Sequence, residues 1–190
     1  MLVQIGQLLV DVVATFVVFL LLARFHFQWL RVPFRNPVGE LIIVATDWIV
    51  RPARRVIAPL AGLDLATLIA ALLVQALALY LIGALAGAGL GNEPGRIIAA
   101  IFVRATFDLV RFSLYILVFS VVMVVVFSWI NPHAPMAPLF NAITRPFLRP
   151  LRRVIPLLGR FDLSPLVLLV LLQIALIMLE SLHAAVTGWS

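Results

Sequence analysis

The chain has 190 residues, of which 64% are hydrophobic and only 12% are charged. Soluble domains carry about a quarter charged residues, so this composition excludes an ordinary water-facing surface. All 14 basic residues are arginine, and there is no cysteine, which excludes disulfides, thiolate metal sites and cysteine nucleophiles.

The net charge of +6 does not point to a nucleic acid. The arginines are confined to short segments between apolar runs, where membrane topology and anionic lipid account for them. We therefore expect membrane lipids, mainly anionic ones, as partners, and no direct binding of nucleic acid. The amino terminus lacks a basic region before its apolar run, so we expect the first run to be retained as a span.

Four apolar runs are long enough to cross a bilayer core about 30 Å thick, which takes roughly 20 helical residues. They cover residues 5–29, 65–90, 101–130 and 163–185. The second run carries Gly83 and Gly87 at a spacing that lets two helices approach closely. The third begins with Arg104, Asp108 and Arg111, which share a helix face and can pair.

The orientation follows from the arginines in the short connections. Six arginines lie from Arg24, near the end of the first span, to Arg55, and five lie between the third and fourth spans. Because basic residues near span ends favour the cytoplasm, we expect both basic segments on that side and both termini on the other.

An internal repeat divides the chain. The segment Arg51-Pro52-Ala53-Arg54-Arg55 recurs as Arg149-Pro150-Leu151-Arg152-Arg153, at an offset of 98 residues that also aligns Asp64 with Asp162 and Gln75 with Gln173. We predict two modules, residues 1–92 and 93–190, each made of span, basic segment and span. The fold class is thus an all-α integral membrane protein with four transmembrane helices in two parallel repeats.

Between the spans of each module, residues 37–58 and 138–158 have the periodicity of a kinked amphipathic helix lying in the membrane interface. Pro52, Pro146 and Pro150 favour a kink or a break over a straight helix. A re-entrant half-helix is the alternative. The candidate lipid- and partner-binding residues are the arginines of these segments: Arg51, Arg54, Arg55, Arg145, Arg149, Arg152 and Arg153.

Polar residues at the spans have structural interpretations. Ser164, followed by Pro165, is typical of a helix start, with Ser164 as the N-cap. Asp64 and Asp162 can each stabilise the start of the span that follows them, where the helix dipole is positive. Alternatively, each can pair with an arginine of its own module, such as Arg55 or Arg153.

Gln75 and Gln173 are expected near the bilayer midplane, where the two amides can approach each other across the repeat axis. Structural contact is favoured over a permeation site for both glutamines.

A metal or haem site is not favoured. His26 and His133 fall near the cytoplasmic ends of the first and third spans and His183 on the other side, without a ligand spacing or a carboxylate partner. We predict no cofactor, no metal and no catalytic residue. The remaining charges within the spans, Asp11, Arg24 and Glu180 among them, are interpreted as span-end anchors or interhelical pairs.

The ordered motifs of the second module resemble the YggT (YlmG-like) family of small membrane proteins. The matching residues are Asn131-Pro132, Thr144, Arg149-Pro150-Leu151-Arg152-Arg153, Ile155-Pro156, Gly159 and Asp162-Leu163-Ser164-Pro165. The first module departs from the pattern, with Ala58-Pro59 in place of Ile-Pro and Ala66-Thr67 in place of Ser-Pro. The resemblance implies a bacterial inner membrane protein without catalytic residues, linked to haem attachment during cytochrome assembly, to cell division or to osmotic stress.

Two functions follow as hypotheses. The leading one is a non-enzymatic scaffold or assembly protein that binds lipid and unidentified membrane proteins through its arginine-rich interfacial helices. The alternative is an ion channel or transporter subunit in osmotic or potassium homeostasis, assembled as a homo-oligomer through Gly83 and Gly87.

Overall fold

A computed structural model describes residues 1–57, 63–89, 93–131, 134–155 and 162–188, and it contains six helices in this part of the chain. These are α1 (Leu2–Trp29), α2 (Pro37–Val56), α3 (Leu65–Leu85), α4 (Pro94–Ile130), α5 (Ala137–Val154) and α6 (Ser164–Thr187). Helices α1, α3, α4 and α6 are long and apolar enough to cross a membrane. The four predicted spans are therefore helices, and both predicted interfacial segments are shorter helices between them.

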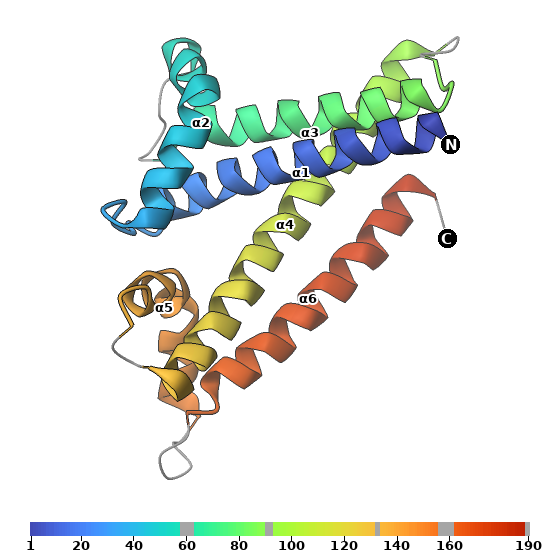
Figure 1. The fold of residues 1–190 in the computed structure, drawn as a ribbon. Helices are drawn as coiled ribbons and strands as arrows, with labels where there is room; N and C mark the ends of the chain where they lie inside the picture. Colours follow the sequence, from blue (N-terminus) through green and yellow to red (C-terminus); the bar gives the residue numbers. More distant parts are fainter. Residues whose placement is uncertain (58–62, 90–92, 132–133, 156–161, 189–190) are drawn as a thin grey trace.

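Each short helix packs on the two long helices of its own half of the chain. Helix α2 contacts α1 and α3, and α5 contacts α4 and α6 (Figure 1). The two halves meet through α4, which also packs against α1 and α3. In Figure 1 the pair α4 and α6 runs obliquely to the pair α1 and α3. This arrangement suits two repeats, although the predicted boundary at residue 92 lies outside the described residues.

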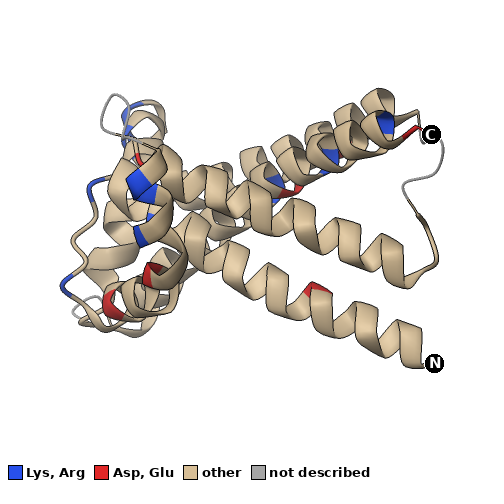
Figure 2. Ribbon diagram, turned by 90° about the horizontal axis from the view of Figure 1, so that it is seen from above, with Lys and Arg blue, Asp and Glu red and all other residues tan. Residues whose placement is uncertain are grey.

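Helices α2 and α5 lie at the end of the molecule opposite to both chain termini (Figure 1). Figure 2 shows basic residues gathered at this same end, with others spaced along α4. The two basic segments thus share one side, as a parallel repeat requires.

A buried core joins the short helices to the spans at this end. One cluster of buried apolar side chains joins Ile42 of α2, Val121 of α4, Ile143 of α5 and Leu168 of α6. The exposed apolar side chains cover the outer surfaces of the long helices instead, as expected where lipid is the solvent.

Both short helices continue through their prolines, so neither is broken. Pro52 lies inside α2, and Pro146 and Pro150 lie inside α5. All three prolines are exposed. The carbonyl group that each proline leaves without its helical donor therefore lies on a side that water or headgroups can reach.

The two glycines of α3 do not form a common packing face, contrary to the expectation from their spacing. Helix α3 ends at Leu85, and Gly87 adopts a φ of +83° beyond it. Gly87 N donates to Ala84 O at 3.0 Å and Ala88 N donates to Gly83 O at 2.9 Å, which is a Schellman motif. Gly87 therefore terminates the helix rather than admitting a second one.

The entry to α2 depends on a glycine. Asn36 caps the helix by accepting from Gly39 N at 2.8 Å, and Pro37 occupies the first turn. A Cβ at residue 39 would lie 2.5 Å from the carbonyl oxygen of Phe34. The close approach of this backbone turn thus requires the absence of a side chain.

We expect Gly39→Ala to lower the free energy of unfolding by about 1–3 kcal/mol, as overpacking does. Gly95→Ala is the matched control, because a Cβ at Gly95 in the first turn of α4 meets nothing within 4 Å. Thermal unfolding in detergent checks both variants. Equal melting temperatures for the two would contradict the close approach.

Candidate functional site

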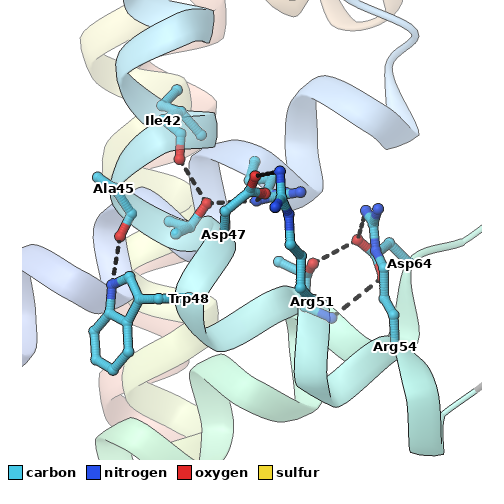
Figure 3. Close-up of polar contacts among 10 residues, drawn as sticks. Ile42, Ala45, Asp47, Trp48, Arg51, Arg54 and Asp64 are labelled. Atoms are coloured by element: carbon cyan, nitrogen blue, oxygen red, sulfur yellow. Dashed lines mark hydrogen bonds and ion pairs between the residues drawn. The ribbon is translucent and has the colours of Figure 1, made fainter.

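An ion pair ties α2 to the span that follows it. Arg54 near the end of α2 donates to Asp64, with Nη2 to Oδ2 at 2.5 Å, and the two residues face each other between α2 and α3 (Figure 3). Asp64 also caps α3, because Oδ1 accepts from Thr67 N at 3.3 Å and Oδ2 accepts from the Thr67 hydroxyl. The carboxylate therefore serves the helix start and the ion pair together.

The second module repeats the pair at the same offset. Arg152 Nε donates to Asp162 Oδ2 at 2.8 Å. Asp162 Oδ1 accepts from Ser164 N at 2.9 Å, and α6 begins at Ser164 itself. The expectation that Ser164 is the N-cap is wrong, because Asp162, two residues earlier, accepts the first free N–H group in its place.

The arginine partners of these carboxylates are one residue earlier than Arg55 and Arg153, which the sequence suggested. One residue turns a helix by about 100°, and this rotation directs Arg54 and Arg152 to the spans. Arg54 and Arg152 reach the carboxylates with 42% and 48% of their side chains still exposed, whereas Arg55 and Arg153 are exposed and pair with no acid in the described residues. We call the pairs Arg54–Asp64 and Arg152–Asp162 the module clamps.

The first module has a second attachment. Arg24, 5% exposed near the end of α1, donates from Nη1 to the Thr46 hydroxyl at 2.8 Å and to Asp47 Oδ1 at 2.9 Å. Arg51 joins Asp47 from the outer side, with Nη2 to Oδ2 at 2.7 Å. Asp47 thus lies between a buried and an exposed guanidinium. The only sequence signal for this attachment is an arginine inside an apolar run, which requires a partner.

The second module lacks this attachment. The offset of 100 that aligns Trp29 with Trp129 places Val124 at the position of Arg24, and the offset of 98 places Arg145 at the position of Asp47. Val124 is 8% exposed in the core, and Arg145 is exposed. Where the first module has a buried ion pair, the second module therefore has an apolar side chain in the core and an arginine that faces outward.

The two interfacial helices differ in charge as a result. Helix α2 has three arginines and two acids, a formal charge of +1, whereas α5 has four arginines and no acid, a formal charge of +4. Within the described chain, Arg145, Arg149 and Arg153 are exposed and have no ion-pair partner. We call these three residues the α5 arginine face.

Helix α2 carries an exposed apolar edge instead. Leu41 is 57% exposed, Val44 is 76% exposed and Trp48 is 69% exposed, at the spacing of one helix side. The opposite side, which includes Ile42, Thr46 and Val50, is buried against the spans. Trp48 also lines, with Ile49, one end of an apolar groove of about 490 Å³ between α1 and α3.

The two repeated glutamines do not meet. Gln75 is 5% exposed and donates from Nε2 to Asp108 Oδ2 of α4 at 3.0 Å. Gln173 is exposed on α6. The expectation of an amide pair across the repeat axis within one chain is therefore wrong, since α4 packs against α3 and supplies Asp108 first. Asp108 also lies 3.8 Å from Arg111 on its own helix, as the predicted face allows.

The histidines lie apart. His26 Nδ1 is 2.7 Å from Leu22 O, next to Trp29, and His183 packs against Phe107. His133 and the motif residues Pro132, Pro156 and Gly159 lie outside the described residues. Among the residues that the structure describes, no group of three His, Asp or Glu side chains is placed to hold a metal ion.

The clamp carboxyls are held in their charged form. Burial by itself would raise the pKa of Asp64, but the hydrogen bonds from Arg54 and Thr67 outweigh it and hold that pKa below 3.8. The pKa of Asp162 is likewise lowered against the effect of burial, by Ser164 and Arg152. Both module clamps are therefore ionised at neutral pH.

The model of the CCB3/YggT family matches this chain twice, over residues 3–85 and 103–183. An uncharacterized protein of Pseudomonas aeruginosa is 32% identical over 171 residues, which are 89% of this chain and 85% of that protein. The protein YggT of Escherichia coli K12 is 28% identical over 159 residues, 81% of this chain and 78% of its own. A Vibrio alginolyticus protein is also 28% identical, over 83% of this chain and 84% of its own. No solved structure matches the chain.

We expect Asp47→Asn to lower the free energy of unfolding by about 3–5 kcal/mol, because it leaves the buried Arg24 without a counter-charge. Arg51→Gln, which removes the 77% exposed partner of the same carboxylate, should cost less than about 1 kcal/mol. Unfolding in detergent measures both. Similar losses in the two variants would show that Asp47 does not serve mainly to neutralise Arg24.

The module clamps also predict an acid response. Since Asp64 and Asp162 have lowered pKa values in the folded chain, their stabilisation is complete above about pH 4 and is lost as the pH falls through those lowered values. The wild-type melting temperature should therefore fall as the pH drops below about 4. The double variant Asp64→Asn/Asp162→Asn should have a lower melting temperature at neutral pH, and that temperature should change less as the pH falls. Parallel curves for the two proteins would contradict this origin of acid sensitivity.

Proposed function

The chain belongs to the CCB3/YggT family, and from that premise we propose that it is a non-enzymatic membrane scaffold that binds anionic lipid headgroups through α5. The observation that carries the proposal is the α5 arginine face, three exposed arginines without an acid in the same helix. Arg145, Arg149 and Arg153 follow one another at four-residue steps, about 6 Å apart along the axis.

Guanidinium groups suit this task. Each presents a planar set of donors that can bind two phosphate oxygens at once, and the group stays charged at every physiological pH. The module clamp supports the geometry, because Arg152, bound to Asp162, fixes the rotation of α5 and directs the other arginines outward. Arg152 therefore acts as a positioning residue, although it belongs to the same basic motif.

Helix α2 supports the proposal in a different way. Its exposed edge of Leu41, Val44 and Trp48 suits the acyl region just below the headgroups, where tryptophan is common. The apolar groove next to Trp48 fits an acyl chain and offers an ion no ligands. In this proposal α2 anchors the scaffold in the bilayer, and α5 collects anionic headgroups or acidic segments of partner proteins.

The arginine distribution supports a cytoplasmic location for α2 and α5, and the bacterial relatives support the inner membrane. Both termini would then lie on the opposite side. The inner leaflet offers the anionic surface potential that such a helix requires.

The test is the triple variant Arg145→Gln/Arg149→Gln/Arg153→Gln. At about 1 kcal/mol for each cation near an anionic surface, the variant should bind anionic phospholipid roughly 100-fold more weakly. Native mass spectrometry of the purified protein, titrated with phosphatidylglycerol and with phosphatidylcholine, measures retained lipid.

Two controls sharpen this test. The corresponding triple lysine variant keeps the charge and should retain most of the binding. The glutamine variant should keep the wild-type melting temperature, because the three arginines pair with no acid among the described residues. Unchanged retention of phosphatidylglycerol by the glutamine variant would refute the proposal.

A further inference from the structure

A glutamine on the outer surface of α6 has no partner in the described chain. Gln173 is exposed and lies nine residues after Ser164, about 14 Å along the helix and so near the middle of a bilayer core. A primary amide facing lipid lacks hydrogen-bond partners for both its donor and its acceptor, which is costly in an apolar medium. The position therefore calls for a polar group from outside the chain.

The repeat shows how the chain treats the same residue elsewhere. Gln75, the counterpart at the offset of 98, donates to Asp108 on α4, a helix that packs along α3. Within the described residues α6 contacts α4 and α5, and no helix takes the place on α6 that α4 takes on α3. Gln173 of the second module therefore lacks the covering helix that its counterpart Gln75 has in the first module.

The neighbours of Gln173 form a regular stripe. Leu166, Val170 and Ile177 are 61%, 52% and 63% exposed, and together with Gln173 they follow one another at steps of four, three and four residues. This alternation is the a and d spacing of two helices packed in parallel, in which one polar residue fixes the register. We call these four residues the α6 stripe.

We propose that the α6 stripe binds the α6 stripe of a second copy of this chain, with the two Gln173 amides hydrogen-bonded to each other. A second copy in the same membrane has the same orientation, so a two-fold axis along the membrane normal brings Gln173 onto its own counterpart at equal depth. An amide both donates and accepts, so two copies satisfy each other without a different partner.

Glu180 marks the outer limit of this interface. It lies seven residues beyond Gln173 on the same side of α6, about 24 Å from Ser164, where a carboxylate can reach the water of the far interface. The dimer thus joins its copies through apolar side chains and one amide pair within the bilayer. It also places two α5 arginine faces in one assembly, although it forms independently of lipid binding there.

The absence of native cysteine makes a direct test available. Single variants Val170→Cys and Ile177→Cys are oxidised in native membranes, and disulfide-linked dimers are measured by electrophoresis. Leu171→Cys and Met178→Cys are matched controls, since both residues are exposed on α6 but lie about 110–130° around the helix from the centre of the stripe. We expect dimers at Val170 and Ile177 at least five times as abundant as at the controls.

The amide pair is tested by adding Gln173→Leu to Val170→Cys and Ile177→Cys. Leucine keeps the stripe apolar and leaves the fold intact, so the melting temperature in detergent should not fall, whereas the cross-linked fraction should drop several-fold. Gln173→Asn should keep part of it. Equal cross-linking at stripe and control positions, cross-links only to other proteins, or no change with Gln173→Leu would each overturn the proposal.

Discussion

The carboxylate before each returning span determines how its interfacial helix is held. Asp64 and Asp162 each receive N–H donors from the start of a long helix and a guanidinium from the short helix before it. One residue therefore fixes two directions, the start of the span and the rotation of the basic helix. Once Arg54 or Arg152 is directed inward, the helical repeat directs Arg55 or Arg153 outward. The exposed basic surface depends on this constraint.

The two modules share one arrangement of helices but expose different side chains on their short helices. In the first, Arg24 and Asp47 bind α2 to α1, and α2 exposes an apolar edge beside its charged residues. In the second, Val124 fills the core and Arg145 faces outward. Burying an ion pair costs desolvation of both charges, so replacing it with an apolar contact need not weaken the fold. The exchange leaves α5 with a surface on which every charged residue is basic.

The sequence was sufficient for the four long helices, the two short ones and the shared side of the basic segments, because span length, amphipathic periodicity and the offset of 98 depend on local pattern. It was insufficient wherever a partner comes from a distant helix. Asp108 as the partner of Gln75 and Asp47 as the partner of Arg24 depend on how helices pack, which no periodicity encodes. The prediction of a packing face at Gly83 and Gly87 was wrong for a local reason, because a glycine near the end of a helix can adopt a positive φ and terminate that helix.

The most direct test of the account is to measure the distance between α5 and α6 after the Arg152–Asp162 ion pair is removed. Spin labels on Val154→Cys and Met178→Cys, both at exposed positions of a cysteine-free chain and both outside the α6 stripe, report that distance by pulsed electron resonance. We expect a narrow distribution in the otherwise unchanged protein, a broad one with Arg152→Ala, and recovery of the narrow one when Arg152→Asp is combined with Asp162→Arg. A distribution that stays equally narrow with Arg152→Ala would contradict the claim that this ion pair holds the arginine helix in place.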